Sequence, residues 1–255
     1  MQSEGPEYQD LHLVRNTYKS GEYHLKGSRN HEIFAESKLG TLKARISREN
    51  YKIKACICIT MYGEEFSELI KTMTGIIKYV GEQQNNDSAV TADEILVFLV
   101  CDGFDHVKPE FKEKLKELSL YDENKINEED LCRKEGKLSV NQNKYESNPS
   151  EEAVLNNCVH CFFKQIHRFE KIPEWEKAHL ENTTPFVNFF LCMKHFNGGK
   201  LDSHFWFMRG FCNLIKPQFI FMIDIGTEPT AKSISILQHR MEQHIDIGGC
   251  CGNYF

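Results

Sequence analysis

The chain has 255 residues, of which 40% are hydrophobic and 27% charged, a composition that suits one large folded domain or two small ones. Its formal net charge of −6 argues against a general nucleic-acid-binding protein. Several of the ten cysteines lie inside apolar runs, which indicates buried thiols in a reducing compartment rather than a disulfide framework. The polar, acidic N-terminus is not typical of a secretory signal peptide, and no run of about 18 apolar residues predicts a membrane-spanning helix.

The first half of the chain begins with a polar stretch and continues with strand and helix patterns. Residues 1–50 show weak periodicity, so we expect an N-terminal extension to a domain that covers residues 51–255. The run IKACICITM at 53–61 predicts a first strand, and apolar residues that recur every three or four positions predict a helix from 64 to about 80. The run EILVFLV at 94–100 predicts a second strand.

The middle of the chain combines a polar segment with further regular patterns. A helix is expected at 109–118, and residues 121–152 carry nine acidic against five basic side chains, a net charge of −4. We interpret this segment as a solvated insertion in the domain. Apolar residues predict a helix over 153–170, and the run FVNFFLCM predicts a third strand at 186–193.

The last third of the chain contains the strand with the most informative ending. A helix expected at 203–215 and stopped by Pro217 precedes the run FIFMIDIGT, residues 219–227, in which the apolar residues lead directly into Asp224. A continuous apolar run predicts a strand buried on both faces, as in a parallel sheet covered by helices. A final helix is expected to begin at Pro229 and Thr230. The alternation of strands and helices predicts an α/β fold with right-handed crossovers.

Polar side chains follow three of the predicted strands, and the ends of parallel strands share one rim of a sheet, so these groups can converge. For a nucleoside diphosphate sugar, Tyr62 could stack on the base and Asp102 could accept hydrogen bonds from the base or ribose. Asp224 could hold Mg²⁺ or Mn²⁺ across the two phosphates, and Lys194 or Lys200 could add positive charge there. Each residue alone has a simpler interpretation as a turn, packing or surface residue, so only the joint pattern favours a ligand site.

Five blocks of the sequence resemble, in order and spacing, successive motifs of chitin synthases, which are processive glycosyltransferases of the GT-A kind. The blocks are ICITMYGEE, FLVCDG, FFLCMKHFNGGKLDSHFWF, FIFMIDIGTEP and IGGCCGNYF. They cover about residues 53–255, and the block around Ser203, His204 and Trp206 is the most specific. The resemblance implies a GT-A (nucleotide-diphospho-sugar transferase) α/β fold, with a parallel or mixed sheet and flanking helices, that is incomplete at its C-terminus.

The resemblance also implies a donor-binding site and one metal ligand. The donor-binding residues are Thr60, Tyr62, Glu64, Asp102, Lys200, Gly249, Cys251 and Gly252. Tyr62 is expected against uracil, Asp102 on the uridine and Lys200 on the diphosphate, while the last three residues match the sugar-side G-x-C-G loop. Asp224 is the expected ligand of Mg²⁺ or Mn²⁺. Five positions depart from the family pattern, and the last of them puts the sugar contacts in doubt: Gly63, Cys101, Asp202, Phe205 and Asn253.

The implied reaction transfers N-acetylglucosamine from UDP-GlcNAc to the 4-hydroxyl of a growing β-1,4-linked chitin chain. Two family motifs do not occur in the chain: E-D-R, whose acid is the general base, and Q-R-R-R-W, which holds the chitin oligomer. We therefore expect the donor-binding front half of an enzyme of the cytoplasmic face of the plasma membrane, which binds UDP but cannot elongate chitin by itself. No catalytic residue is assigned, and a homodimer is left open as its assembly.

Three alternatives remain. One is a non-catalytic UDP-binding or regulatory homologue, and another is a different GT-A sugar transferase, against which the S-H-x-W block argues. The third is a zinc site formed by Cys158, Cys161, Cys192 and His195, whose spacing suits metal ligands. Burial of these cysteines is the simpler interpretation, and His160 is expected at the surface of a helix.

Overall fold

The computed structural model describes residues 7–15, 23–27, 53–84, 92–126, 158–167, 186–212, 215–244 and 246–252, the first two ranges as backbone only. The strands are β1 (Glu7–Arg15), β2 (Tyr23–Gly27), β3 (Ala55–Met61), β4 (Ile95–Cys101), β5 (Cys158–His167), β6 (Phe186–Lys194) and β7 (Phe219–Asp224). The α-helices are α2 (Phe66–Gln84), α3 (Pro109–Glu117), α7 (Lys200–Phe205) and α9 (Ala231–Gln243). Shorter turns are η1 (Ala92–Glu94), η2 (Phe104–His106) and η3 (Glu123–Lys125), and η4 (Trp206–Cys212) is a π-helix.

The described strands form one mixed sheet in the order β2-β1-β5-β6-β4-β3-β7. The four strands predicted from apolar runs, β6, β4, β3 and β7, are its parallel part, which confirms the predicted α/β fold. The prediction that the strand ending at Asp224 is buried on both faces is wrong, because β7 lies at the edge of the sheet and exposes Ile220 and Met222 on one face. In the register, Met61 lies opposite Cys101, and Thr60 lies opposite Asp224. The carboxyl ends of β3, β4 and β7 therefore meet at one rim of the sheet.

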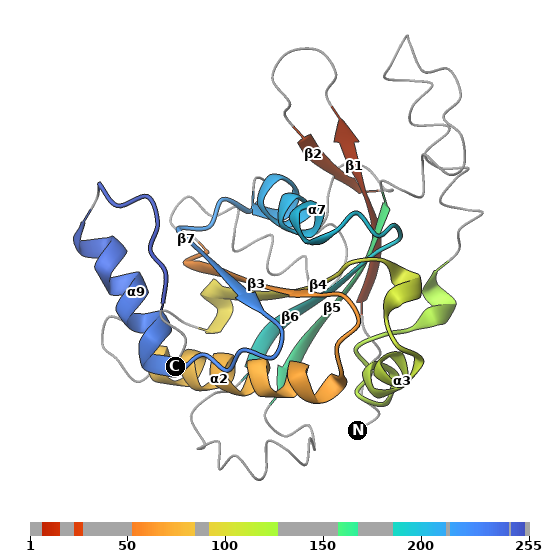
Figure 1. Cartoon of the computed structure of the whole chain (residues 1–255), viewed down its shortest axis with the longest axis horizontal. Helices are drawn as coiled ribbons and strands as arrows, with labels where there is room; N and C mark the ends of the chain where they lie inside the picture. Colours follow the sequence, from red (N-terminus) through yellow and green to blue (C-terminus); the bar gives the residue numbers. More distant parts are fainter. Residues whose placement is uncertain are drawn as a thin grey trace.

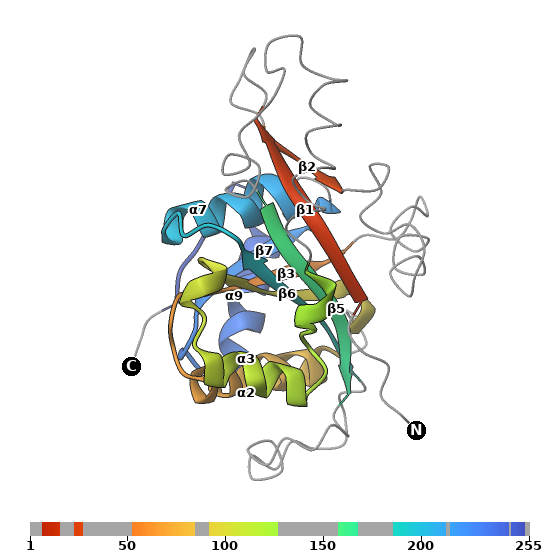
Figure 2. The same ribbon diagram turned by 90° about the vertical axis from the view of Figure 1, so that its right-hand side faces the viewer.

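Helices cover both faces of this sheet. Figures 1 and 2 show α2 and α3 on one face and α7 on the other. Alternate residues of β3 point to opposite sides, so Ile57 and Ile59 pack in the cluster with α2, while Cys56 and Cys58 pack in the cluster with η4. The strand is buried on both faces along its whole length, which explains its continuous apolar sequence.

The prediction of a helix over 153–170 is wrong for the residues that the structure describes. Residues 158–167 form β5, which pairs antiparallel with β6 and places Cys161 opposite Cys192. Phe162 packs in the cluster on the α2 face and Phe163 in the cluster on the η4 face. Because both faces of β5 are buried, its apolar residues run together, a pattern that a buried helix also produces. His160 is fully buried on this strand, and not at a helix surface as expected.

The remaining predicted helices are present with shifted bounds. The helix expected at 203–215 begins at Lys200 as α7 and continues into the π-helix η4. The last helix, α9, begins after Thr230, whose hydroxyl accepts a hydrogen bond from the N–H of Ser233 at 3.1 Å, an N-cap. None of the helices in the described ranges combines the length and the apolar character needed to cross a bilayer.

Two polar regions are described only in part. Within residues 1–50, β1 and β2 extend the sheet beyond β5, and the remaining residues lie outside the described ranges. In the segment 121–152, the structure describes residues 121–126, where Tyr121 is buried in the core. Residues 127–152 of the predicted insertion lie outside the described residues. The thiols of Cys56, Cys58 and Cys192 are buried and unbridged, as predicted.

Candidate functional site

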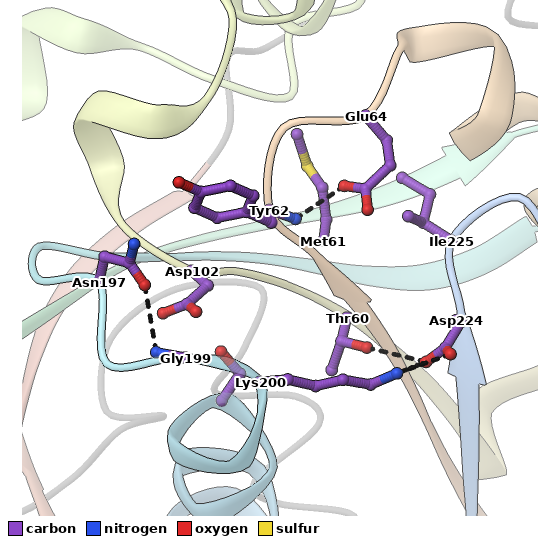
Figure 3. A pocket seen from close by; sticks show the side chains of 11 residues that line it. Thr60, Met61, Tyr62, Glu64, Asp102, Asn197, Gly199, Lys200, Asp224 and Ile225 are labelled. Carbon is purple, nitrogen blue, oxygen red and sulfur yellow. Dashed lines mark hydrogen bonds and ion pairs between the residues drawn. The ribbon is translucent and has the colours of Figure 1, made fainter.

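A cavity of about 550 Å³ opens at the rim where the parallel strands end (Figure 3). Its lining residues are Thr60, Met61, Tyr62, Glu64, Asp102, Asn197, Gly199, Lys200, Ser203, Asp224 and Ile225. They come from the ends of β3, β4 and β7, from α7 and from the loop before it. The volume lies within the range of about 300–1,000 Å³ that is usual for small-molecule sites. Open α/β sheets bind ligands at this place, outside the carboxyl ends of their strands.

Backbone geometry fixes the two carboxylates at the strand ends. The N–H of Asp102 donates to the carbonyl of Met61 at 2.8 Å, which ties the end of β4 to β3. The hydroxyl of Thr60 donates to Oδ1 of Asp224 at 3.3 Å across β3 and β7. After the two acids, the chain turns through Gly103 with a φ of 95° and Gly226 with a φ of 90°, which favours glycine at both positions.

Tyr62 forms an aromatic shelf at the mouth of the cavity. Its side chain is 49% exposed, and its ring lies 5.0 Å from that of His106, with the hydroxyl 3.4 Å from Nδ1 of His106. The Glu64 carboxylate accepts hydrogen bonds from the backbone N–H groups of Tyr62 at 2.7 Å and Gly63 at 3.0 Å. Glu64 therefore stabilises the turn that presents the tyrosine ring, and the ring keeps an open face for a planar ligand.

Asp224 and Lys200 form an ion pair inside the cavity. The ammonium of Lys200 lies 2.6 Å from the Asp224 carboxylate, and both side chains are 53% exposed. The hydrogen bond from Lys200 lowers the pKa of the Asp224 carboxyl below its usual value, and Thr60 adds to this effect while partial burial opposes it. Partial burial, followed by the charge of Lys200, lowers the pKa of His204. Asp224 is therefore ionised and His204 neutral near neutral pH.

Asp102 takes part in a buried ion cluster below the cavity. The ammonium of Lys194 lies 2.6 Å from Oδ1 of Asp102 and 2.5 Å from Oδ2 of Asp202. The N–H of Gly198 also donates to Oδ1 of Asp102, at 3.0 Å. Lys194 is 1% exposed and does not line the cavity, so it is neither the phosphate contact nor the surface residue that the sequence suggested.

A family model described as a chitin synthase-like glycosyltransferase domain matches residues 55–255. The chain belongs to this family. Its mixed sheet with flanking helices is the α/β glycosyltransferase fold, consistent with GT-A, and the predicted resemblance is confirmed.

Chitin synthases of fungi and of Phytophthora are among the similar proteins. The chain is 28% identical over 204 residues to chitin synthase 2 of Mycosarcoma maydis, covering 77% of this chain and 16% of that protein. It is 27% identical over 212 residues to chitin synthase 2 of Cryptococcus neoformans, covering 80% and 19%. With chitin synthase 1 of Phytophthora sojae the identity is 28% over 208 residues, covering 77% and 19%. The chain thus spans less than a quarter of the length of these relatives.

The structure gathers five of the eight predicted donor-binding residues, and the predicted metal ligand, at the cavity of this glycosyltransferase domain. Thr60, Tyr62, Glu64, Asp102, Lys200 and Asp224 all line it. The other three, Gly249, Cys251 and Gly252, do not line the cavity. Their segment lies against α9, where the thiol of Cys250 donates to the carbonyl of Leu237 at 3.7 Å. Asn253 lies outside the described residues.

Sequence reasoning did not single out Asn197 and Gly199, which also line the cavity. The side-chain oxygen of Asn197 accepts a hydrogen bond from the N–H of Gly199 at 3.1 Å and shapes the loop before α7 (Figure 3). Both residues belong to the long block FFLCMKHFNGGKLDSHFWF, so the available signal was their place in a glycosyltransferase motif. Gly199 has a φ of 84°, a conformation that favours glycine.

The alternative zinc site is not assembled in the described part of the chain. Cys161 and Cys192 lie across β5 and β6 with their sulfur atoms 3.7 Å apart. Among the described residues, however, no three or more His, Cys, Asp or Glu side chains gather as metal ligands. Burial raises the pKa of the Cys192 thiol well above its usual value, as expected for a cysteine packed in the core.

Proposed function

We propose that this chain forms the donor-binding part of a chitin synthase and binds UDP-GlcNAc in the cavity at the strand ends. The observation that carries the proposal is the arrangement of an aromatic shelf, a buried acid and a lysine–aspartate pair around one cavity of about 550 Å³. An aromatic face suits a base, and charged groups suit a diphosphate. The choice of N-acetylglucosamine as the sugar and chitin as the polymer rests on the similarity to chitin synthases.

The nucleoside belongs at the end of the cavity with Tyr62 and Asp102. Tyr62 offers an exposed ring face for stacking on the uracil. Asp102 is a carboxylate and accepts hydrogen bonds without donating them, so it favours a base or ribose that presents an N–H or O–H group. Glu64 takes part indirectly, because its hydrogen bonds to the backbone hold the turn that carries Tyr62.

The diphosphate belongs at the other end, beside Lys200 and Asp224. Among the described residues that line the cavity, Asp224 is the carboxylate at this end, and it accepts a hydrogen bond from the hydroxyl of Thr60. One carboxylate alone provides too few ligands to hold a metal ion tightly, but Mg²⁺ commonly binds through one or two carboxylates together with substrate phosphates. This donor set therefore fits a divalent cation that enters with the diphosphate. Bound there, Mg²⁺ or Mn²⁺ supplies a Lewis acid that stabilises the departing UDP.

The carboxylates of the described cavity are all engaged. Glu64 accepts two backbone N–H groups, Asp102 is paired with Lys194, and Asp224 is paired with Lys200. A general base must take the proton of the acceptor hydroxyl, and each of these carboxylates already has another role in the proposed donor site. We therefore expect the 255-residue polypeptide to bind UDP without elongating chitin. In this proposal, the complete reaction also requires a chitin acceptor, and it takes place at the cytoplasmic face of the plasma membrane.

The same observation favours a second candidate function, a UDP-binding or regulatory homologue without transfer activity. The two candidates share the donor site and differ in chemistry. Incubating the purified chain with labelled UDP-GlcNAc and chitin oligomers should give no polymer under either candidate, because elongation requires a general base in addition to the donor site. Product formation would refute our expectation for this polypeptide.

The proposed ligand class is tested by titrating UDP, GDP and ADP into the protein at a fixed Mn²⁺ concentration. All three share the diphosphate, so the differences report the nucleoside end of the cavity. We expect UDP to bind most tightly, and we expect Tyr62→Ala to reduce that preference. Equal affinities for the three nucleotides would contradict a uridine site.

A further inference from the structure

We propose that Lys194 is a positioning residue of the donor site. It holds one oxygen of the Asp102 carboxylate so that the other oxygen faces the cavity and accepts an N–H or O–H group of the nucleoside. This inference rests on the proposed function, because it concerns how the same cavity recognises its nucleotide.

The burial of Lys194 excludes direct contact with a ligand. Lys194 is the last residue of β6, its side chain is 1% exposed, and it is absent from the cavity lining. Its ammonium is surrounded by Oδ1 of Asp102 at 2.6 Å, Oδ2 of Asp202 at 2.5 Å and the hydroxyl of Ser203 at 3.4 Å. A lysine is almost never this deeply buried unless it is paired, so its role lies in these contacts.

The two oxygens of Asp102 have different surroundings. Oδ1 accepts hydrogen bonds from Lys194 and from the N–H of Gly198, while Oδ2 accepts none from the residues that the structure describes. Among the described residues, Oδ2 of Asp102 is not one of the buried polar atoms without a partner, since only the hydroxyl of Tyr121 is. An oxygen that has no partner and is not buried must be accessible, so Oδ2 faces the cavity that Asp102 lines. The two donors on Oδ1 orient the carboxylate. An oriented carboxylate oxygen selects a ligand group that donates a hydrogen bond, such as the imide N–H of a pyrimidine.

Lys194 also fastens the start of α7. Asp202 and Ser203 belong to this helix, and Lys200, the predicted diphosphate contact, is its first residue. Gly198 permits the close approach, because a Cβ added there would lie 2.6 Å from Oδ2 of Asp202. Asp202 does not line the cavity and its side chain is 38% exposed, so the contact with Asp102 is the one that reaches the nucleotide site. The ion pairs of Lys194 with Asp102 and with Asp202 can be removed by separate substitutions, which makes the proposal testable.

The experiment measures UDP affinity by calorimetry at saturating Mn²⁺ in five proteins. They are the wild type and the variants Lys194→Met, Asp202→Asn, Asp102→Asn and Asp102→Asn with Lys194→Met. Lys194→Met should weaken UDP binding by roughly tenfold or more, the loss that one charge-assisted hydrogen bond typically represents. Asp202→Asn is the matched control, since it keeps the pair between Lys194 and Asp102 and should bind UDP within about twofold of the wild type.

The decisive comparison is made in the Asp102→Asn background. If Lys194 acts through Asp102, adding Lys194→Met there should cause no further loss of UDP affinity. A further loss of UDP affinity as large as that caused by Lys194→Met in the wild type would mean that Lys194 supports the fold in general. This result would overturn the proposal. This pair also carries the test if Lys194→Met alone fails to fold, because Asp102→Asn removes the unpaired charge. Unchanged affinity in Lys194→Met would refute only this inference, whereas no UDP binding by the wild type would refute the proposed function.

Discussion

Replacing Lys200 with methionine should change the affinity of the site for metal and for nucleotide in opposite directions. The ammonium of Lys200 occupies the position of a cation on the Asp224 carboxylate, at 2.6 Å. Lys200→Met removes this competitor and leaves the carboxylate with the Thr60 hydroxyl alone. Mn²⁺ added without nucleotide should then bind more tightly, while Mn²⁺-dependent UDP binding should weaken because a phosphate contact is lost.

The exposure of the pair sets the size of both effects. Each side chain is 53% exposed, and ion pairs of this kind contribute only about 0.2–1 kcal/mol, so Mn²⁺ affinity should rise by at most about fivefold. A hydrogen bond to a charged group contributes about 1.5–3 kcal/mol, so UDP affinity should fall roughly tenfold to a hundredfold. The small cost of opening the pair also explains how a diphosphate could draw Lys200 away from Asp224. Salt screens exposed pairs, so the gain in Mn²⁺ affinity should shrink at high ionic strength.

Electron paramagnetic resonance of free Mn²⁺ measures the first affinity, and calorimetry of UDP measures the second. Lys232→Met is a suitable control, because Lys232 is an exposed residue of α9 that does not line the cavity. This control should leave both affinities unchanged. A loss of Mn²⁺ affinity in Lys200→Met, or unchanged UDP affinity, would show that Lys200 and Asp224 do not share the diphosphate and its cation.

Three further predictions concern the shelf, the core and pH. Tyr62→Ala should weaken UDP binding by about 1–3 kcal/mol and Tyr62→Phe much less, as measured by calorimetry, because the ring face carries the stacking. Gly75→Ala should lower the urea midpoint although alanine favours helices, because its Cβ would press on the carbonyl and ring of Pro229. Since His204 has a lowered pKa, the unfolded chain binds more protons below pH 6.5 and stability should fall there; His204→Gln should flatten this fall in urea titrations at several pH values.

The parallel part of the sheet could be predicted because its strands are apolar runs, and three of them, β3, β4 and β6, are buried on both faces. Such strands are short apolar runs bounded by polar or glycine residues, and β7 has the same form although one of its faces is exposed at Ile220 and Met222. Their shared direction follows from the helices between them, and it places the residues after the strands on one rim. The convergence of Tyr62, Asp102 and Asp224 at one cavity was therefore within reach of the sequence.

The strand β5 shows where the sequence was ambiguous. Its residues are apolar on both faces, and periodicity alone cannot distinguish a short buried strand from a buried helix. Its identity is decided by pairing with β6 and with β1, which is more than 140 residues earlier in the chain. The hairpin of β1 and β2 was likewise not predicted, because its polar sequence carries weak periodicity and gains its place from this pairing.

The ion pairs in the site also could not be predicted from the sequence. Lys194 is buried because Asp102, 92 positions earlier, ends the neighbouring strand, and no local pattern distinguishes it from a surface lysine. Lys200 and Asp224 could each be proposed as ligand contacts, but their pairing depends on how α7 crosses the ends of β3 and β7. The loop with Gly249, Cys251 and Gly252 was placed at the sugar by resemblance, and this remains a prediction, since the structure has it against α9.

Calorimetric titration of UDP with and without Mn²⁺, in the wild type and in Asp224→Asn, tests the central claim most directly. We expect clear UDP binding that depends on Mn²⁺ in the wild type. Asp224→Asn keeps the shape of the side chain and removes its charge, so the dependence on Mn²⁺ should disappear in this variant. Binding that is unaffected by Mn²⁺ and by the substitution, or no binding by the folded wild type, would contradict a metal-assisted donor site at this cavity.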